Sequence, residues 1–73
     1  MILALNDSVE VMIGGKIVKG NLTNIKVYGI GNVESLDLFN LFLDRRSTTL
    51  DLEDNNHWAY LDQLLSINGK NLH

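Results

Sequence analysis

Residues 8–19, SVEVMIGGKIVK, contain the clearest structural signal in the chain. Valine and isoleucine alternate with other side chains on both sides of Gly14 and Gly15, as they do in strands with one buried face. Two consecutive glycines accept the positive φ angles that a two-residue hairpin turn requires. We therefore expect an antiparallel hairpin in which Glu10 lies opposite Lys19, because this register pairs opposite charges across the strands.

The sequence after the hairpin predicts two more strands. Gly20 interrupts the pattern, and residues 22–30 are rich in β-branched and aromatic side chains. A short strand is also predicted at residues 48–52, with Leu50 and Leu52 on its buried side. These segments together predict an antiparallel meander of three or four strands.

Residues 34–46 allow two interpretations. Their apolar side chains recur at helical spacing, and two arginines near the end suit the last turn of a helix. Residues 38–43 are also apolar on nearly every side, as in a doubly buried strand, and could pair with residues 48–53. A second helix at 34–46 and a strand both remain open.

Residues 56–67 predict a carboxyl-terminal helix. Large apolar side chains, beginning with Trp58, recur on one face, residues 54–56 can cap the start, and Asn68 with Gly69 is a common helix end. The fold class that we expect is therefore α+β, an antiparallel sheet with this helix packed on one face. A small SH3-like β-barrel with the same carboxyl-terminal helix is the alternative.

The composition predicts one folded domain spanning residues 1–73, because 45% of the residues are hydrophobic and 21% are charged. The chain has no cysteine, which excludes disulfides and thiolate metal sites. The apolar run at residues 1–5 is too short for a signal peptide or a membrane span, so we expect a cytoplasmic protein. A chain this small buries only about 60% of its surface, so self-association is also expected.

The sequence offers little for catalysis or metal binding. Nucleophilic catalysis needs a nucleophile beside a base that a third group orients, and the only histidines are His57 and the terminal His73. Residues 51–57 contain oxygen ligands but lack the glycine and the later glutamate of an EF-hand loop. We therefore expect no enzyme activity, no metal site and no cofactor.

Residues 36–43 concentrate six large apolar side chains in eight positions. They form either a central core element or an exposed interaction patch, since a small domain has a limited interior. Arginine and aromatic side chains dominate binding energy at interfaces. The leading hypothesis is a small protein-protein interaction module, such as a regulator or inhibitor encoded by a mobile element of the phage type. Its expected partner-binding residues are Phe39, Phe42, Arg45, Arg46, Trp58 and Tyr60.

Part of the chain resembles the first motif of Sm-like RNA-binding proteins. Apolar side chains alternate across residues 9–13, and Gly15 and Gly20 stand five positions apart, as in that motif. Residues 39–44 are similar to the segment in which the family places an RNA-contacting asparagine, and the resemblance assigns that role to Asn40.

The resemblance implies an alternative function, nucleic-acid binding on a small β-barrel. The formal net charge of −3 argues against a surface dominated by phosphate contacts. Binding would need the basic side chains on one face, with an aromatic side chain available for stacking. The residues concerned are Lys16, Lys19, Lys26, Arg45 and Arg46, with Tyr28 or Trp58 as the stacking residue.

Overall fold

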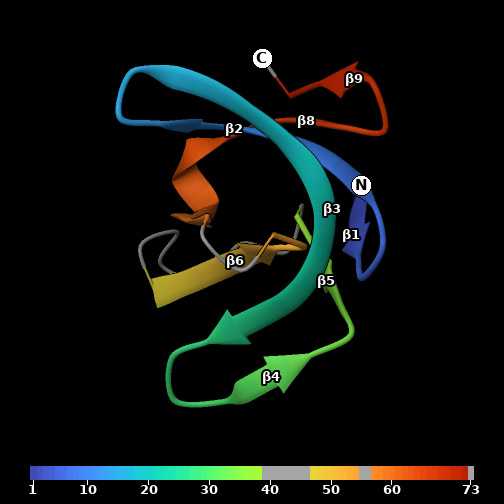
Figure 1. Cartoon of the computed structure of the whole chain (residues 1–73). Helices are drawn as coiled ribbons and strands as arrows, with labels where there is room; N and C mark the ends of the chain where they lie inside the picture. Colours follow the sequence, from blue (N-terminus) through green and yellow to red (C-terminus); the bar gives the residue numbers. More distant parts are fainter. Residues whose placement is uncertain (39–46, 55–56, 73) are drawn as a thin grey trace.

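The longest strand, β3 (Lys16–Val27), organises the computed structural model of the protein, which describes residues 1–38, 47–54 and 57–72. Its first half pairs with β2 (Ser8–Ile13), and its second half pairs with β6 (Thr48–Leu52) and β4 (Gly31–Val33). In Figure 1, β3 arcs across the molecule from the β2 hairpin at the top to β4 at the bottom. One strand therefore connects the two halves of a strongly bent sheet.

The described residues form a seven-strand antiparallel sheet and a separate two-strand sheet. The order in the larger sheet is β7-β6-β3-β2-β8-β9, with β4 also beside β3, where β7 is Trp58–Tyr60, β8 is Leu64–Ile67 and β9 is Lys70–Asn71. The smaller sheet pairs β1 (Ile2–Ala4) with β5 (Ser35–Asp37). The radius of gyration is 11.0 Å, as expected for a compact small domain.

The predicted hairpin is confirmed, including its register. Glu10 lies opposite Lys19, and the turn glycines have φ angles of 57° at Gly14 and 80° at Gly15. The strand predicted at residues 48–52 is confirmed as β6, with Leu50 and Leu52 buried. The hairpin is defined by contacts that are local in the sequence, whereas β6 is indicated by its own alternation of buried side chains and pairs with β3 far earlier in the chain.

The strand predicted at residues 22–30 is not a separate element. It is the second half of β3, which continues through Gly20 and ends at Val27. The Leu52 side chain packs against Gly20, and the pairing with β6 shifts register between Leu22 and Asn24. A glycine and a bulge are features that allow a strand to bend sharply, so here they turn the chain without ending the strand.

The core lies inside the bend of the sheet. Each strand of the larger sheet except β4 and β9 contributes at least one buried aliphatic side chain, and β1 and the 3-10 turn contribute one each. Their burial stabilises the fold through the hydrophobic effect, at roughly 1.5 to 3 kcal/mol for each large side chain. These core residues include Leu3, Val9, Val11, Leu22, Ile25, Leu50, Leu52, Ala59, Leu61, Leu64 and Ile67.

The predicted carboxyl-terminal helix is wrong, and with it the α+β class. Residues 57–67 form β7, a 3-10 turn η2 (Leu61–Gln63) and β8, so the described residues form an all-β domain. The reason is that Ala59 is buried between exposed Trp58 and Tyr60, which is the two-residue period of a strand. The SH3-like alternative included the same helix and is wrong in that respect.

The helix interpretation of residues 34–46 is wrong for its first residues. Ser35–Asp37 forms β5, in which Leu36 lies opposite the buried Leu3 of β1. Leu36 therefore lies opposite an apolar partner near the start of the chain. Residues 39–46, and with them the rest of the helix and strand interpretations, lie outside the described residues.

No described helix has the length and apolar character needed to cross a lipid bilayer.

Candidate functional site

The outward side of β3, β6 and β7 carries the largest group of exposed aromatic side chains among the described residues. The antiparallel register aligns their side chains in two rows. Lys26, Thr49 and Tyr60 form one row, and Asn24, Asp51 and Trp58 form the next. We call these six residues, together with Tyr28 directly after β3, the aromatic face.

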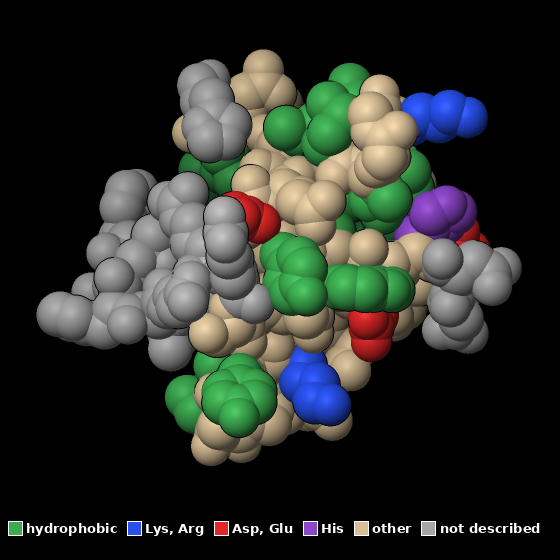
Figure 2. Space-filling model, turned by 90° about the vertical axis from the view of Figure 1, so that its left-hand side faces the viewer, with side chains coloured by type: hydrophobic (Ala, Val, Ile, Leu, Met, Phe, Trp, Pro, Cys, Tyr) green, Lys and Arg blue, Asp and Glu red, His purple; other side chains and the backbone are tan. Residues whose placement is uncertain are grey.

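The aromatic rings of this face are open to solvent. Tyr28 is 85% exposed, Trp58 is 53% exposed and Tyr60 is 39% exposed. Trp58 and Tyr60 pack edge to face, with ring centroids 5.2 Å apart and an angle of 81° between the ring planes. Figure 2 shows hydrophobic side chains gathered on one side of the molecule, with charged side chains next to them. Large exposed apolar groups of this kind mark interaction sites.

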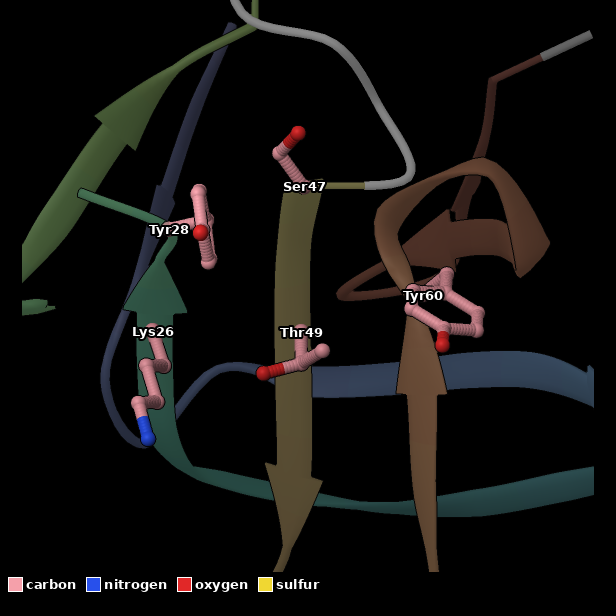
Figure 3. A pocket seen from close by; sticks show the side chains of 5 residues that line it. All are labelled: Lys26, Tyr28, Ser47, Thr49 and Tyr60. Carbon is pink, nitrogen blue, oxygen red and sulfur yellow. The ribbon is translucent and has the colours of Figure 1, made fainter.

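A groove of about 370 Å³ lies on the aromatic face. Its lining comes from three adjacent strands and from Ser47, which directly precedes β6. Figure 3 shows Lys26 and Tyr28 on one side, Ser47 and Thr49 in the middle, and Tyr60 on the other side. The Tyr28 backbone N–H donates to the Ser47 carbonyl at 2.8 Å, which fixes the distance between the two strands at this end of the groove.

The described lining of the groove is polar and contains no carboxylate. Its five described residues carry one ammonium group and four hydroxyls. Lys26 forms no ion pair with any described residue. The neighbouring carboxylate, Asp51, already accepts a hydrogen bond from the Asn24 side-chain amide at 3.3 Å. The groove therefore offers hydrogen-bond donors and one positive charge.

Gln63 holds the edge of the aromatic face in place. Its side-chain oxygen accepts a hydrogen bond from the Tyr60 N–H at 2.8 Å, and its amide nitrogen donates to the Met12 carbonyl at 2.8 Å. The amide thus bridges β7 and β2, which are not neighbours in the sheet. This bridge limits the movement of the strand that carries Tyr60.

The turn before β7 is stabilised by Asp54. Its carboxylate accepts a hydrogen bond from the His57 N–H at 3.1 Å and also contacts the His57 Nδ1. The Leu52 N–H donates to the His57 carbonyl at 3.1 Å. Residues 51–57 were considered for metal binding from the sequence. No three His, Asp or Glu side chains within residues 1–38, 47–54 and 57–72 are grouped to hold a metal ion.

Two of the residues predicted to bind a partner, Trp58 and Tyr60, lie together on the aromatic face. Residues two positions apart lie on different faces of a helix, whereas in a strand they lie on the same side. Phe39, Phe42, Arg45 and Arg46, and also Asn40, lie outside the described residues.

Two lining residues of the groove, Ser47 and Thr49, were not predicted as site residues, and Lys26 and Tyr28 were predicted only for nucleic-acid binding. Alternation in residues 48–52 indicates that Thr49 faces outward, but it does not reveal its neighbours on other strands. Lys19 lies on the other half of β3, beyond the bend and opposite Glu10. The lysines at 16, 19 and 26 therefore do not form a single basic groove.

Comparisons of the chain with models of protein families, with curated proteins and with solved structures give no significant match.

Proposed function

We propose that this protein is a small, non-enzymatic interaction module that binds a protein partner through its aromatic face. The observation that carries the proposal is the exposed, edge-to-face pair of Trp58 and Tyr60 on a strand of the sheet. Tryptophan and tyrosine are enriched at protein interfaces, where a few such side chains supply most of the binding energy.

The position of these anchors on regular strands supports the same proposal. Thr49 and Asp51 of β6 pair with Tyr60 and Trp58 of β7, and Gln63 holds the other side of Tyr60. An anchor that is already ordered loses less conformational entropy when a partner binds. The aromatic face is therefore a pre-organised surface.

The charge distribution favours a protein partner over a nucleic acid. Phosphate contacts require clustered lysine and arginine, and Lys26 is the one basic residue in the part of the groove lining that the structure describes. Lys19 faces Glu10 on the other half of β3, and the whole chain carries a formal net charge of −3. We infer a cytoplasmic location for this interaction, because a chain without cysteine suits a reducing compartment.

The proposal is tested by selecting peptides from a random display library on the immobilised protein. The selected peptides are then synthesised, and their binding is measured by calorimetry. Trp58→Ala should weaken binding at least about 30-fold, because central aromatic anchors contribute about 2 kcal/mol or more. Ile17→Ala is the matched control, since Ile17 is 59% exposed but lies on the hairpin outside the aromatic face.

Failure to select any peptide would contradict the proposal. Peptides that bind the Trp58→Ala variant as tightly as the native chain would contradict it equally.

A second function, binding of single-stranded nucleic acid, is favoured by one observation. Tyr28 is 85% exposed and lies beside Lys26, which suits a base stacking on a ring next to a phosphate contact. The test is fluorescence anisotropy with labelled single-stranded DNA and RNA. Binding that weakens steeply with salt and is lost in Tyr28→Ala would support this function over the first.

A further inference from the structure

We infer that the groove around Lys26 accepts the carboxylate of an aspartate or glutamate side chain from the partner protein. This inference rests on the proposed function and names the chemistry that the partner must present at one position.

The first observation is the composition of the groove lining. Lys26 supplies an ammonium group, and Tyr28, Ser47, Thr49 and Tyr60 supply hydroxyls that can donate hydrogen bonds. A carboxylate is an acceptor with two oxygens, so it can accept several of these bonds together. Hydrogen bonds in which both groups are charged are shorter and stronger than neutral ones.

The second observation is that Lys26 has no acid beside it in the sheet. Its cross-strand neighbours are Asn32 on β4 and Thr49 on β6, and both are uncharged. Asp51 lies in the neighbouring row, where it accepts a hydrogen bond from Asn24. A carboxylate entering the groove therefore gains an ion pair without displacing an existing one.

The third observation is the position of the aromatic rings around the groove. Tyr28 and Tyr60 stand on its two sides (Figure 3), and the Trp58 ring packs edge to face against the Tyr60 ring. These rings place apolar surface on both sides of the groove that Lys26 lines. They also predict apolar residues next to the acid in the partner sequence, since those residues would pack on Tyr60 and Trp58.

A single lysine suits a carboxylate better than a phosphomonoester. A phosphomonoester carries close to two negative charges, and the planar fork of arginine matches it with two hydrogen bonds. Among the described residues, the lining carries one positive charge and no arginine. The charges therefore match in number when the ligand is a carboxylate.

The test repeats the peptide selection on the native chain and on Lys26→Gln. The native chain should enrich peptides with an aspartate or glutamate beside apolar residues, and Lys26→Gln should enrich apolar peptides without an acid. Replacing the acid of a selected peptide by its amide should weaken binding to the native chain about tenfold and leave binding to Lys26→Gln unchanged. Lys70→Gln, on exposed β9 at the far end of the sheet from β7, is the control and should behave as the native chain does.

The outcomes separate this inference from the proposed function. Peptides that depend on Trp58 but show no preference for acids, or that bind Lys26→Gln equally well, would overturn the inference and leave the interaction module intact. An absence of selected peptides would overturn both. Displacement of a bound acidic peptide by a single-stranded oligonucleotide that binds more tightly would also overturn the choice of a protein carboxylate.

Discussion

Thr48 has a buried hydroxyl without a hydrogen-bond partner among the described residues. Removing such a group from water costs free energy that only a hydrogen bond can offset. Thr48→Val keeps the shape of the side chain and removes the hydroxyl, so it should raise the free energy of unfolding by about 1 kcal/mol. Urea denaturation of the two proteins measures the difference.

Thr49→Val is the matched control, because Thr49 is the next residue in β6 and faces outward into the groove. Its hydroxyl is accessible to water, so its removal should change stability by less than about 0.5 kcal/mol. A Thr48→Val protein that unfolds at lower urea than the native chain would mean that the hydroxyl is hydrogen-bonded.

Trp58 and Tyr60 show how much of the candidate site follows from residue type alone. Their type identifies them as candidate anchors, because tryptophan and tyrosine are enriched at interfaces. Their arrangement on the same side of a strand is set by Ala59, whose burial depends on the pairing with Leu50 in β6. Residue type therefore identifies the two side chains as candidate anchors, but it could not predict that they lie together on one face.

At the level of elements, the Gln63 bridge should contribute measurably to stability. Gln63→Met has a similar length but no amide, so the Tyr60 N–H and the Met12 carbonyl lose their partner. We expect the free energy of unfolding to fall by about 1 kcal/mol, the usual value for one or two partly exposed hydrogen bonds. Hydrogen exchange should also become faster at the Tyr60 amide.

The Leu52 amide serves as the internal reference for this experiment, since it donates to His57 and not to Gln63. Its exchange should accelerate only as far as the global loss of stability requires. Equal acceleration at both amides would mean that the bridge has no local effect on β7.

The elements differ in how far the sequence could predict them. Residues 8–19 contain their own turn and their own strand partners, so the hairpin and its register followed from local patterns. Residues 56–67 place large apolar side chains at a spacing that suits a helix as well as a strand, a turn and a strand. The choice depends on partners in β6 and β2, which a local pattern does not contain. The pairing of β1 with β5 could not be predicted for the same reason, because the two strands are far apart in the sequence.

For the molecule as a whole, β8 completes the core and β9 only covers its edge. Leu64 and Ile67 of β8 are buried, whereas both residues of β9 are exposed. A chain ending at Gln63 should therefore lack cooperative unfolding and dispersed NMR signals, because β2 keeps β3 but loses β8 on its other edge, and the core loses two large side chains.

A chain ending at Gly69 is the corresponding control. It keeps β8 and the hydrogen bond from the Asn68 N–H to the Ser8 carbonyl at 2.7 Å, so it should remain folded. A folded chain ending at Gln63 would contradict the role of β8 in completing the sheet.

The pairing of Val9 with Ile67 also determines when the protein can fold during its synthesis. The β2–β3 hairpin can form as soon as it leaves the ribosome, because such hairpins close within microseconds. The free edge of β2 stays unpaired until β8 is translated, which happens well after the hairpin, because synthesis proceeds at only about 5 to 20 residues per second. For that interval of seconds the nascent chain exposes an unpaired apolar strand. This strand is a binding site for chaperones that recognise extended apolar segments.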